Sequence, residues 1–176
     1  MLGSWNVNVS VDAMPQKIAT AVGKLNDMVG CEYKPIAYLG SQVVNGTNHA
    51  VLAEQLVVTG KDTKNIVVVI FHEAGDEVSV VNIERVVIGG AELGGKKIDV
   101  KTEIAGDAKA ALDEKLAGYL GVTIKPFALL ATQVVKGTDY IFAAEVAPVV
   151  PEPAKTVALV TVNQLTDGIG FTDILK

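Results

Sequence analysis

The sequence is poor in the residues that build disulfides, metal sites and many catalytic centres. Its 176 residues include one cysteine, Cys31, two histidines and one tryptophan, and only 5% are aromatic. A single cysteine excludes an internal disulfide, which is consistent with a reducing compartment. The histidines, His49 and His72, have no cysteine or carboxylate near them at the spacing of metal ligands, so we expect no metal site and no cofactor.

Charge of one sign and long apolar runs are also scarce. Charged residues make up 20% of the chain and the net charge is −5. This diffuse acidic balance lacks the basic patch that nucleic acid or an anionic membrane attracts, so we predict neither partner. No apolar run is long enough to span a bilayer, and the N-terminus lacks the basic and apolar regions of a signal peptide. We therefore expect a cytoplasmic protein, unless the chain begins after a processing site.

The chain contains an internal repeat with a period of 91 residues. Residues 1–85 align without a gap on residues 92–176, and 23 of the 85 pairs are identical. An ungapped register of this length indicates a duplication. We therefore predict two domains, residues 1–91 and residues 92–176, joined by a glycine-rich hinge.

Each repeat begins with the pattern of a strand followed by a helix. Residues 5–11 alternate between apolar and polar types, which is the period of a half-buried strand. Apolar residues spaced by three and four then predict one helix in each repeat, ended by Gly30 and Gly121. These apolar stripes consist of Ile18, Ala21, Val22, Leu25, Met28 and Val29, and of Ala108, Leu112, Leu116, Tyr119 and Leu120.

Four more strands are predicted after the first helix, near residues 33–44, 47–59, 65–72 and 78–88. Short turns separate them, so we expect antiparallel hairpins. One helix with one apolar stripe must lie on one face of this sheet. The predicted fold class is α+β, with tandem domains that each pack one α-helix across an antiparallel β-sheet of four to five strands.

The sequence Gln-Val-Val-x-Gly occurs at the predicted first hairpin turn of both repeats, at 42–46 and 133–137. Each repeat also begins with Leu-Gly, as Leu2-Gly3 and as Leu93-Gly94. Together these motifs resemble the cystatin family, in particular the stefins. The resemblance extends over the whole chain, once per repeat, and implies two tandem cystatin-like domains.

The resemblance implies a reversible, non-covalent inhibitor of papain-like cysteine proteases, so the expected partner is a protein and the chain is not itself an enzyme. In such inhibitors the leading glycine and two hairpin turns enter the protease cleft. Valines at the turn offer apolar surface with little rotamer entropy to lose, and glycine permits close approach of the backbone. The protease-binding residues implied here are Leu2, Gly3, Gln42, Val43, Val44, Asn45, Gly46, His72, Glu73, Ala74, Gln133, Val134, Val135, Lys136, Gly137, Asn163, Gln164 and Leu165.

The second hairpin turns lack the aromatic residue on which binding energy often concentrates. The second leading glycine, Gly94, is also tethered to the first repeat, so we expect the first repeat to be the better inhibitor. Asn45-Gly46 is a strong turn signal by itself, and the motif could serve folding alone. The main alternative is therefore a structural or assembly protein, including a homo-oligomer, that uses the duplicated fold for protein–protein interaction. Inhibition of another protease class and a small-molecule enzyme are weaker alternatives.

Overall fold

Ten strands and two short helices make up the part of the chain that a computed structural model describes, residues 3–59, 61 and 63–176. The chain divides into two compact units, Met1–Gly90 and Ala91–Lys176. Both have the same order of elements: one strand, one helix and then four strands.

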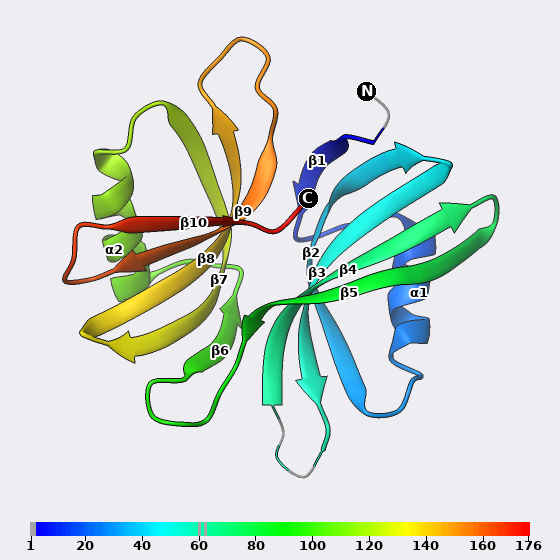
Figure 1. Ribbon diagram of the computed structural model, residues 1–176, viewed down its shortest axis with the longest axis horizontal. Helices are drawn as coiled ribbons and strands as arrows, with labels where there is room; N and C mark the ends of the chain where they lie inside the picture. The colour runs from blue at the N-terminus through cyan, green and yellow to red at the C-terminus, as the bar shows by residue number, and fades with distance from the viewer. Residues whose placement is uncertain (1–2, 60, 62) are drawn as a thin grey trace. The chain divides into compact units, whose positions relative to one another are not determined.

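The first unit is a five-stranded antiparallel sheet with a helix between its first two strands. The strand order in the sheet is the order in the chain, and Figure 1 shows the last four strands as a continuous meander. Its elements are β1 (Trp5–Ser10), α1 (Gln16–Leu25), β2 (Cys31–Val44), β3 (Gly46–Val57), β4 (Thr63–Ala74) and β5 (Glu77–Ile88).

The second unit is also a five-stranded antiparallel sheet, and neighbouring strands in it are again consecutive in the chain. Its last strand has five residues, whereas the last strand of the first unit has 12. Its elements are β6 (Lys96–Lys101), α2 (Gly106–Ala117), β7 (Val122–Val135), β8 (Gly137–Pro148), β9 (Thr156–Asn163) and β10 (Ile169–Asp173).

The predicted α+β class, with tandem cystatin-like domains of one helix packed across a sheet, is wrong. The protein is mostly β, because the helices have only 10 and 12 residues while the longest strands have 14. Successive residues of a strand point to opposite faces of the sheet. Val51 and Leu52 on β3 therefore face opposite sides of the sheet, as do Ile66 and Val67 on β4, yet all four are completely buried. A sheet with one face in water would expose alternate residues, so the central strands of this sheet are buried on both faces.

The helices also end earlier than their apolar stripes predicted. Helix α1 ends at Leu25, and the next two stripe members, Met28 and Val29, are 65% and 104% exposed. Asn26 follows the helix and holds the backbone of Tyr33 on β2 with both ends of its amide, at 2.9 and 2.6 Å. This contact ends the helix because it draws the chain onto the sheet. The last two members of the second stripe are likewise exposed, at 40% and 89%.

A cluster of buried apolar side chains joins each helix to its own sheet. Side chains of this size each contribute about 1.5–3 kcal/mol when they leave water, so the clusters hold the helices against the strands. In the first unit the cluster is Ile18, Ala21, Val22, Leu25, Tyr33, Tyr38, Val51, Ala53, Val67, Val69 and Phe71. In the second it is Ala108, Ala111, Leu112, Leu129, Phe142, Ala144, Val160 and Val162.

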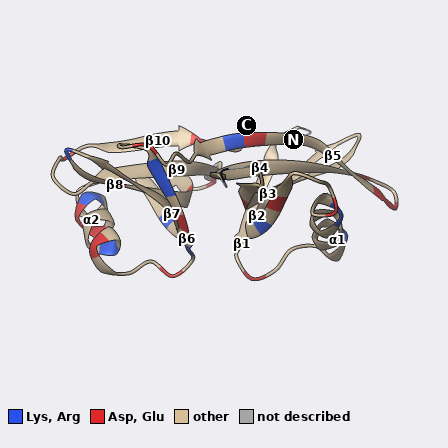
Figure 2. Ribbon diagram, turned by 90° about the horizontal axis from the view of Figure 1, so that it is seen from below, with Lys and Arg blue, Asp and Glu red and all other residues tan. Residues whose placement is uncertain are grey.

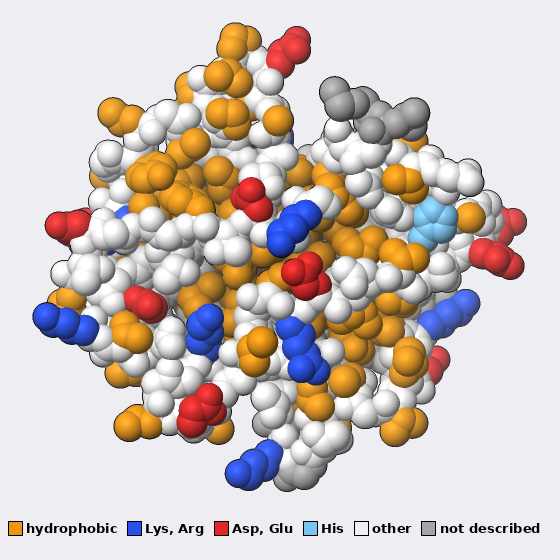
Figure 3. Space-filling model, viewed as in Figure 1, with side chains coloured by type: hydrophobic (Ala, Val, Ile, Leu, Met, Phe, Trp, Pro, Cys, Tyr) orange, Lys and Arg blue, Asp and Glu red, His pale blue; other side chains and the backbone are white. Residues whose placement is uncertain are grey.

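The surface mixes charged and apolar groups. Figure 2 shows lysines and acidic residues interspersed on α2, and Figure 3 shows apolar side chains reaching the surface at several separate places on the viewed face. In the described part of the chain, neither helix has the length and apolar character needed to cross a membrane. Within those same residues, no three His, Cys, Asp or Glu side chains lie close enough together to hold a metal ion.

Candidate functional site

The Gln-Val-Val-x-Gly sequence of the first unit forms the tip of the β2–β3 hairpin. Val44 pairs directly with Gly46, so Asn45 alone makes the turn. Gly46 has a φ of +96°, and a Cβ on it would lie 2.5 Å from the backbone oxygen of Glu73 on β4. Glycine is therefore required here both for its backbone conformation and for the close approach of the two strands.

The paired valines at this tip stand in solvent. Val43 is 54% exposed and Val44 is 37% exposed, although both belong to a sheet whose central strands are buried. Their strand continues into the core through Leu39, which is fully buried. The tip therefore presents apolar surface at the end of a hairpin whose strand is anchored in the core.

The leading glycine is hydrogen bonded to the hairpin tip. The Gly3 backbone N–H donates to the Val43 carbonyl oxygen at 3.0 Å, and Gln42 Nε2 donates to the Gly3 carbonyl oxygen at 2.6 Å. These two bonds bracket the glycine residue. The glutamine of the motif thus has a structural task, which is to fix the leading segment beside the turn.

A chain of hydrogen bonds continues from Gln42 to the second hairpin. Asn48 Nδ2 donates to Gln42 Oε1 at 3.0 Å, and Asn48 Oδ1 lies 2.8 Å from His72 Nδ1. Because an amide oxygen only accepts, the His72 tautomer in this bond carries its proton on Nδ1. Gly3, the first hairpin tip and the second hairpin are thereby joined into one surface. We call this surface, residues 3, 42–46 and 72–76, the first edge.

Lysine from helix α1 supports the second hairpin tip of the first edge. Lys17 Nζ donates to the Gly75 carbonyl oxygen at 3.1 Å. It also lies 3.7 Å from Asp76 Oδ1 and 4.0 Å from Glu73 Oε2. Exposed ion pairs of this kind contribute at most about 1 kcal/mol, so the helix mainly positions the turn.

The second unit repeats this surface with different chemistry. Gln133 Nε2 donates to the Gly94 carbonyl oxygen at 2.9 Å, as its counterpart does in the first unit. Val134 and Val135 are 73% and 44% exposed. Leu93, which precedes the glycine, is fully exposed. We call residues 93–94, 133–137 and 163–167 the second edge.

Asn163 joins the two hairpin tips of the second edge. Its Nδ2 donates to Asp139 Oδ1 at 2.7 Å and to the Lys136 carbonyl oxygen at 3.1 Å. The Gln164 N–H also donates to the Thr138 carbonyl oxygen at 3.2 Å. The Asn48–His72 hydrogen bond of the first unit is thus replaced by an Asp139–Asn163 hydrogen bond in the second. The two hairpin tips are hydrogen bonded to each other in both units.

The structure places most of the predicted binding residues on these two edges, apart from Leu2, which lies outside the described residues. Asn48 and Lys17 were missed by sequence reasoning. Asn48 directly follows the motif, and its ability to both donate and accept was the available signal. Lys17 carried no signal, because only the packing of α1 brings it to a turn about 60 residues away along the chain.

A buried polar pair lies directly below the first edge. Tyr38 Oη is 2.8 Å from His49 Nδ1, and His49 is only 7% exposed. His49 Nε2 is buried and has no hydrogen-bond partner among the described residues. Burial lowers the pKa of His49, against a smaller opposing effect of the Glu73 charge. Burial also raises the pKa of Tyr38, and its hydrogen bond with Ser41 offsets this in part.

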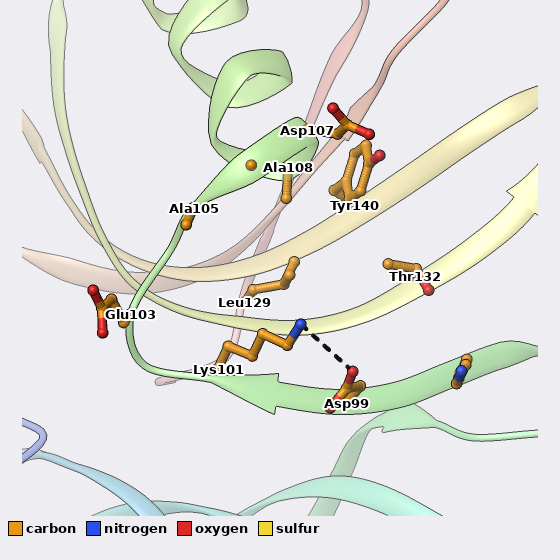
Figure 4. Close-up of a pocket in the computed structure, with 11 residues that line it drawn as sticks. Asp99, Lys101, Glu103, Ala105, Asp107, Ala108, Leu129, Thr132 and Tyr140 are labelled. Atoms are coloured by element: carbon orange, nitrogen blue, oxygen red, sulfur yellow. Dashed lines mark ion pairs between the residues drawn. The ribbon is translucent and has the colours of Figure 1, made fainter.

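A separate hollow of about 440 Å³ lies beside the start of α2. Figure 4 shows Lys101 and Asp99 paired at its lower side, with Tyr140 and Asp107 above them. Lysines and carboxylates mix around it, so its charge does not select one kind of ligand. None of the predicted binding residues lines this hollow.

The two edges offer apolar side chains, backbone groups and amides held in place by hydrogen bonds. Such an arrangement suits binding in a groove. Comparison of the chain with protein-family models, with curated proteins and with solved structures finds no match.

Proposed function

We propose that the protein is a reversible, non-covalent inhibitor of papain-like cysteine proteases and that its two edges are the binding surfaces. The observation that carries this proposal is the set of hydrogen bonds joining Gly3 to Gln42, Gln42 to Asn48, and Asn48 to His72. Three segments far apart in the sequence form one surface before any partner is present. Two exposed valines stand at its centre.

Preorganisation is the physical reason why such a surface suits inhibition. Ordering a free backbone residue costs about 1–2 kcal/mol, and a partner that meets a preformed edge avoids most of that cost. Valine loses little side-chain entropy on burial, so its apolar area converts well into affinity. A surface that is rigid and held by the sheet also resists adopting the geometry needed for cleavage.

The motif supplies the identity of the proposed partner. Gln-Val-Val-x-Gly beside a leading Leu-Gly resembles the cystatin family, whose members inhibit papain-like proteases. Turn formation needs the glycine but has no need of the glutamine, whose side chain binds the leading glycine in both units. The family resemblance and the hydrogen bonds to the leading glycines thus both single out the glutamine of the motif.

Both edges belong to the proposal. The second edge adds Leu165, which is 64% exposed and packs over Gly137 at the neighbouring tip. In the first edge the His72 ring lies over Gly46 in place of an apolar side chain. Leu165 gives the second edge more apolar surface, which weighs against our expectation that the first repeat binds better.

Titration of papain with matched variants tests the proposal. Val43→Asp together with Val134→Asp places a charge on both edges, which must lose its water on entering the cleft. Val58→Asp with Val149→Asp is the control, because these valines are 50% and 67% exposed and follow the opposite ends of β3 and β8. We expect the edge variant to inhibit at least about tenfold more weakly, equivalent to about 1.4 kcal/mol.

The unchanged chain should inhibit papain at stoichiometric protein, and the control variant should match it. If micromolar unchanged protein leaves papain active, the inhibitor proposal is wrong. If both variants inhibit equally well, inhibition occurs but the edges are not the binding surfaces.

A further inference from the structure

The two units differ at two positions below their edges. In the first unit, Tyr38 and His49 form the buried hydrogen-bonded pair. The same strand positions of the second unit, the eighth residue of β7 and the fourth of β8, hold Leu129 and Tyr140. The second unit therefore has no histidine at this place. A difference in titration between the two edges follows from it.

His49 lies where it controls the first hairpin tip. It is adjacent to Asn48, which carries the hydrogen bonds to Gln42 and to the second hairpin. It also pairs across the strands with Ser41, next to Gln42. Any displacement of the His49 ring outward must move one of these neighbours.

Adding a second proton to the His49 imidazole is unfavourable, because neither ring nitrogen has a free hydrogen-bond partner for it in the described part of the chain. Tyr38 already occupies Nδ1, and Nε2 is buried without a partner among the described residues. Protonation would leave a buried N–H donor unsatisfied and add a charge to an apolar site. The ring must then leave the core or recruit water.

Other charged groups around His49 act in opposite directions. Glu73 on β4 favours the charged imidazolium through its own charge. Lys17 on α1 lies 4.0 Å from Glu73 and weakens that effect. Tyr38 on β2 also faces the ring, and it stays neutral under acidic conditions because a phenol ionises only at about pH 10 and above.

We propose that Tyr38 and His49 form an acid-sensitive joint that loosens the tip of the first edge as the pH falls, and so weakens that edge's hold on its protease partner. The second clause rests on the proposed function, whereas the first does not. The affinity of the second edge for the protease does not change over the same pH range. The first edge thus binds more weakly at acidic pH than at neutral pH, whereas the second edge does not change.

The direction of this pH effect follows from the linkage between protonation and folding. Because burial lowers the pKa of folded His49, the unfolded or opened state binds the proton more readily. The stability due to this group is therefore complete above the ordinary histidine pKa of 6.5 and is lost as the pH falls below it. At pH 5 the loss is at most about 30-fold in the opening equilibrium, since each pH unit is worth a factor of ten.

Amide hydrogen exchange of the full chain tests the joint directly. We would compare opening of residues 38–42 and 48–51 at pH 7.5 and pH 5.0 after correction for intrinsic exchange rates. We expect opening to rise by about 3-fold to 30-fold in the unchanged protein. The double variant Tyr38→Leu with His49→Tyr, which copies the second unit, should not show this rise. His49→Gln is the second variant, in case the double variant does not fold.

A binding measurement tests the link to the protease. Inactivated papain would be bound at both pH values by chains whose second edge is disabled by Val134→Asp. We expect the affinity to fall at pH 5.0, by at most about 30-fold, and to fall less when the chain also carries Tyr38→Leu and His49→Tyr. Equal exchange behaviour in the unchanged and variant chains, within about twofold, overturns the joint itself. If papain binds at neither pH, the proposed function fails, and the exchange result still decides the joint.

Discussion

Replacement of Gly46 by alanine should separate the hairpin tips of the first edge. The added Cβ would lie 2.5 Å from the Glu73 backbone oxygen and 2.9 Å from a carbon of the His72 ring. A positive φ at a non-glycine residue costs about 1–2 kcal/mol, and overpacking against backbone adds about 1–3 kcal/mol. We therefore expect Gly46→Ala to reduce the free energy of unfolding of the first unit by about 2–5 kcal/mol.

Gly75→Ala is the matched control for that change. Gly75 also has a positive φ, of +61°, but nothing lies within 4 Å of the Cβ that alanine would add. It should cost only about 1–2 kcal/mol. Urea unfolding followed by tryptophan fluorescence reports on the first unit, because Trp5 on β1 is the single tryptophan. Equal stability of the two variants, within about 0.5 kcal/mol, would refute the close approach of the two hairpin tips.

Buried and hydrogen-bonded side chains of the two units give three further tests. Phe71→Ala empties a completely buried site and should cost the first unit about 3–5 kcal/mol in urea unfolding, whereas Phe142→Ala should leave the tryptophan transition unchanged. Burial raises the pKa of Tyr38, so the stability that this side chain contributes is complete below about pH 10 and is lost above it. The free energy of unfolding, followed by tryptophan fluorescence, should therefore fall more between about pH 9 and pH 11 in the unchanged protein than in Tyr38→Leu. Gln42→Leu removes two side-chain hydrogen bonds, so the binding free energy of the first edge for papain should weaken by about 1–3 kcal/mol. Gln133→Leu removes one, so the second edge should lose about 0.5–1.5 kcal/mol. Equal losses would contradict the described network.

The hairpins and their turns could be anticipated from the sequence, but the fold class could not. Asn45-Gly46 between two apolar runs is a local signal, and the chain does turn there. The balance between helix and sheet depends on what covers each sheet face. The pattern Val51-Leu52 looks the same whether one face or both are buried, and here both residues are fully buried. That ambiguity led to the wrong α+β prediction.

The contacts of the edges were also only partly visible in the sequence. Repetition of Gln42 at Gln133 indicated a role beyond the turn, and the side chain of each binds a leading glycine. The roles of Asn48 and of the buried Tyr38–His49 pair depend on strand register and on burial. Register is set by pairing across the whole sheet, so no local pattern could specify these contacts.

A hydrogen-exchange footprint of the chain bound to inactivated papain tests the central claim most directly. We predict slowed exchange at Gly3, at residues 42–46 and 72–76, and at the matching segments 94, 133–137 and 163–167. The far ends of the hairpins, near Val58 and Val149, should exchange as in the free protein. Protection confined to those far ends or to the helices, with both edges unchanged, would contradict the account.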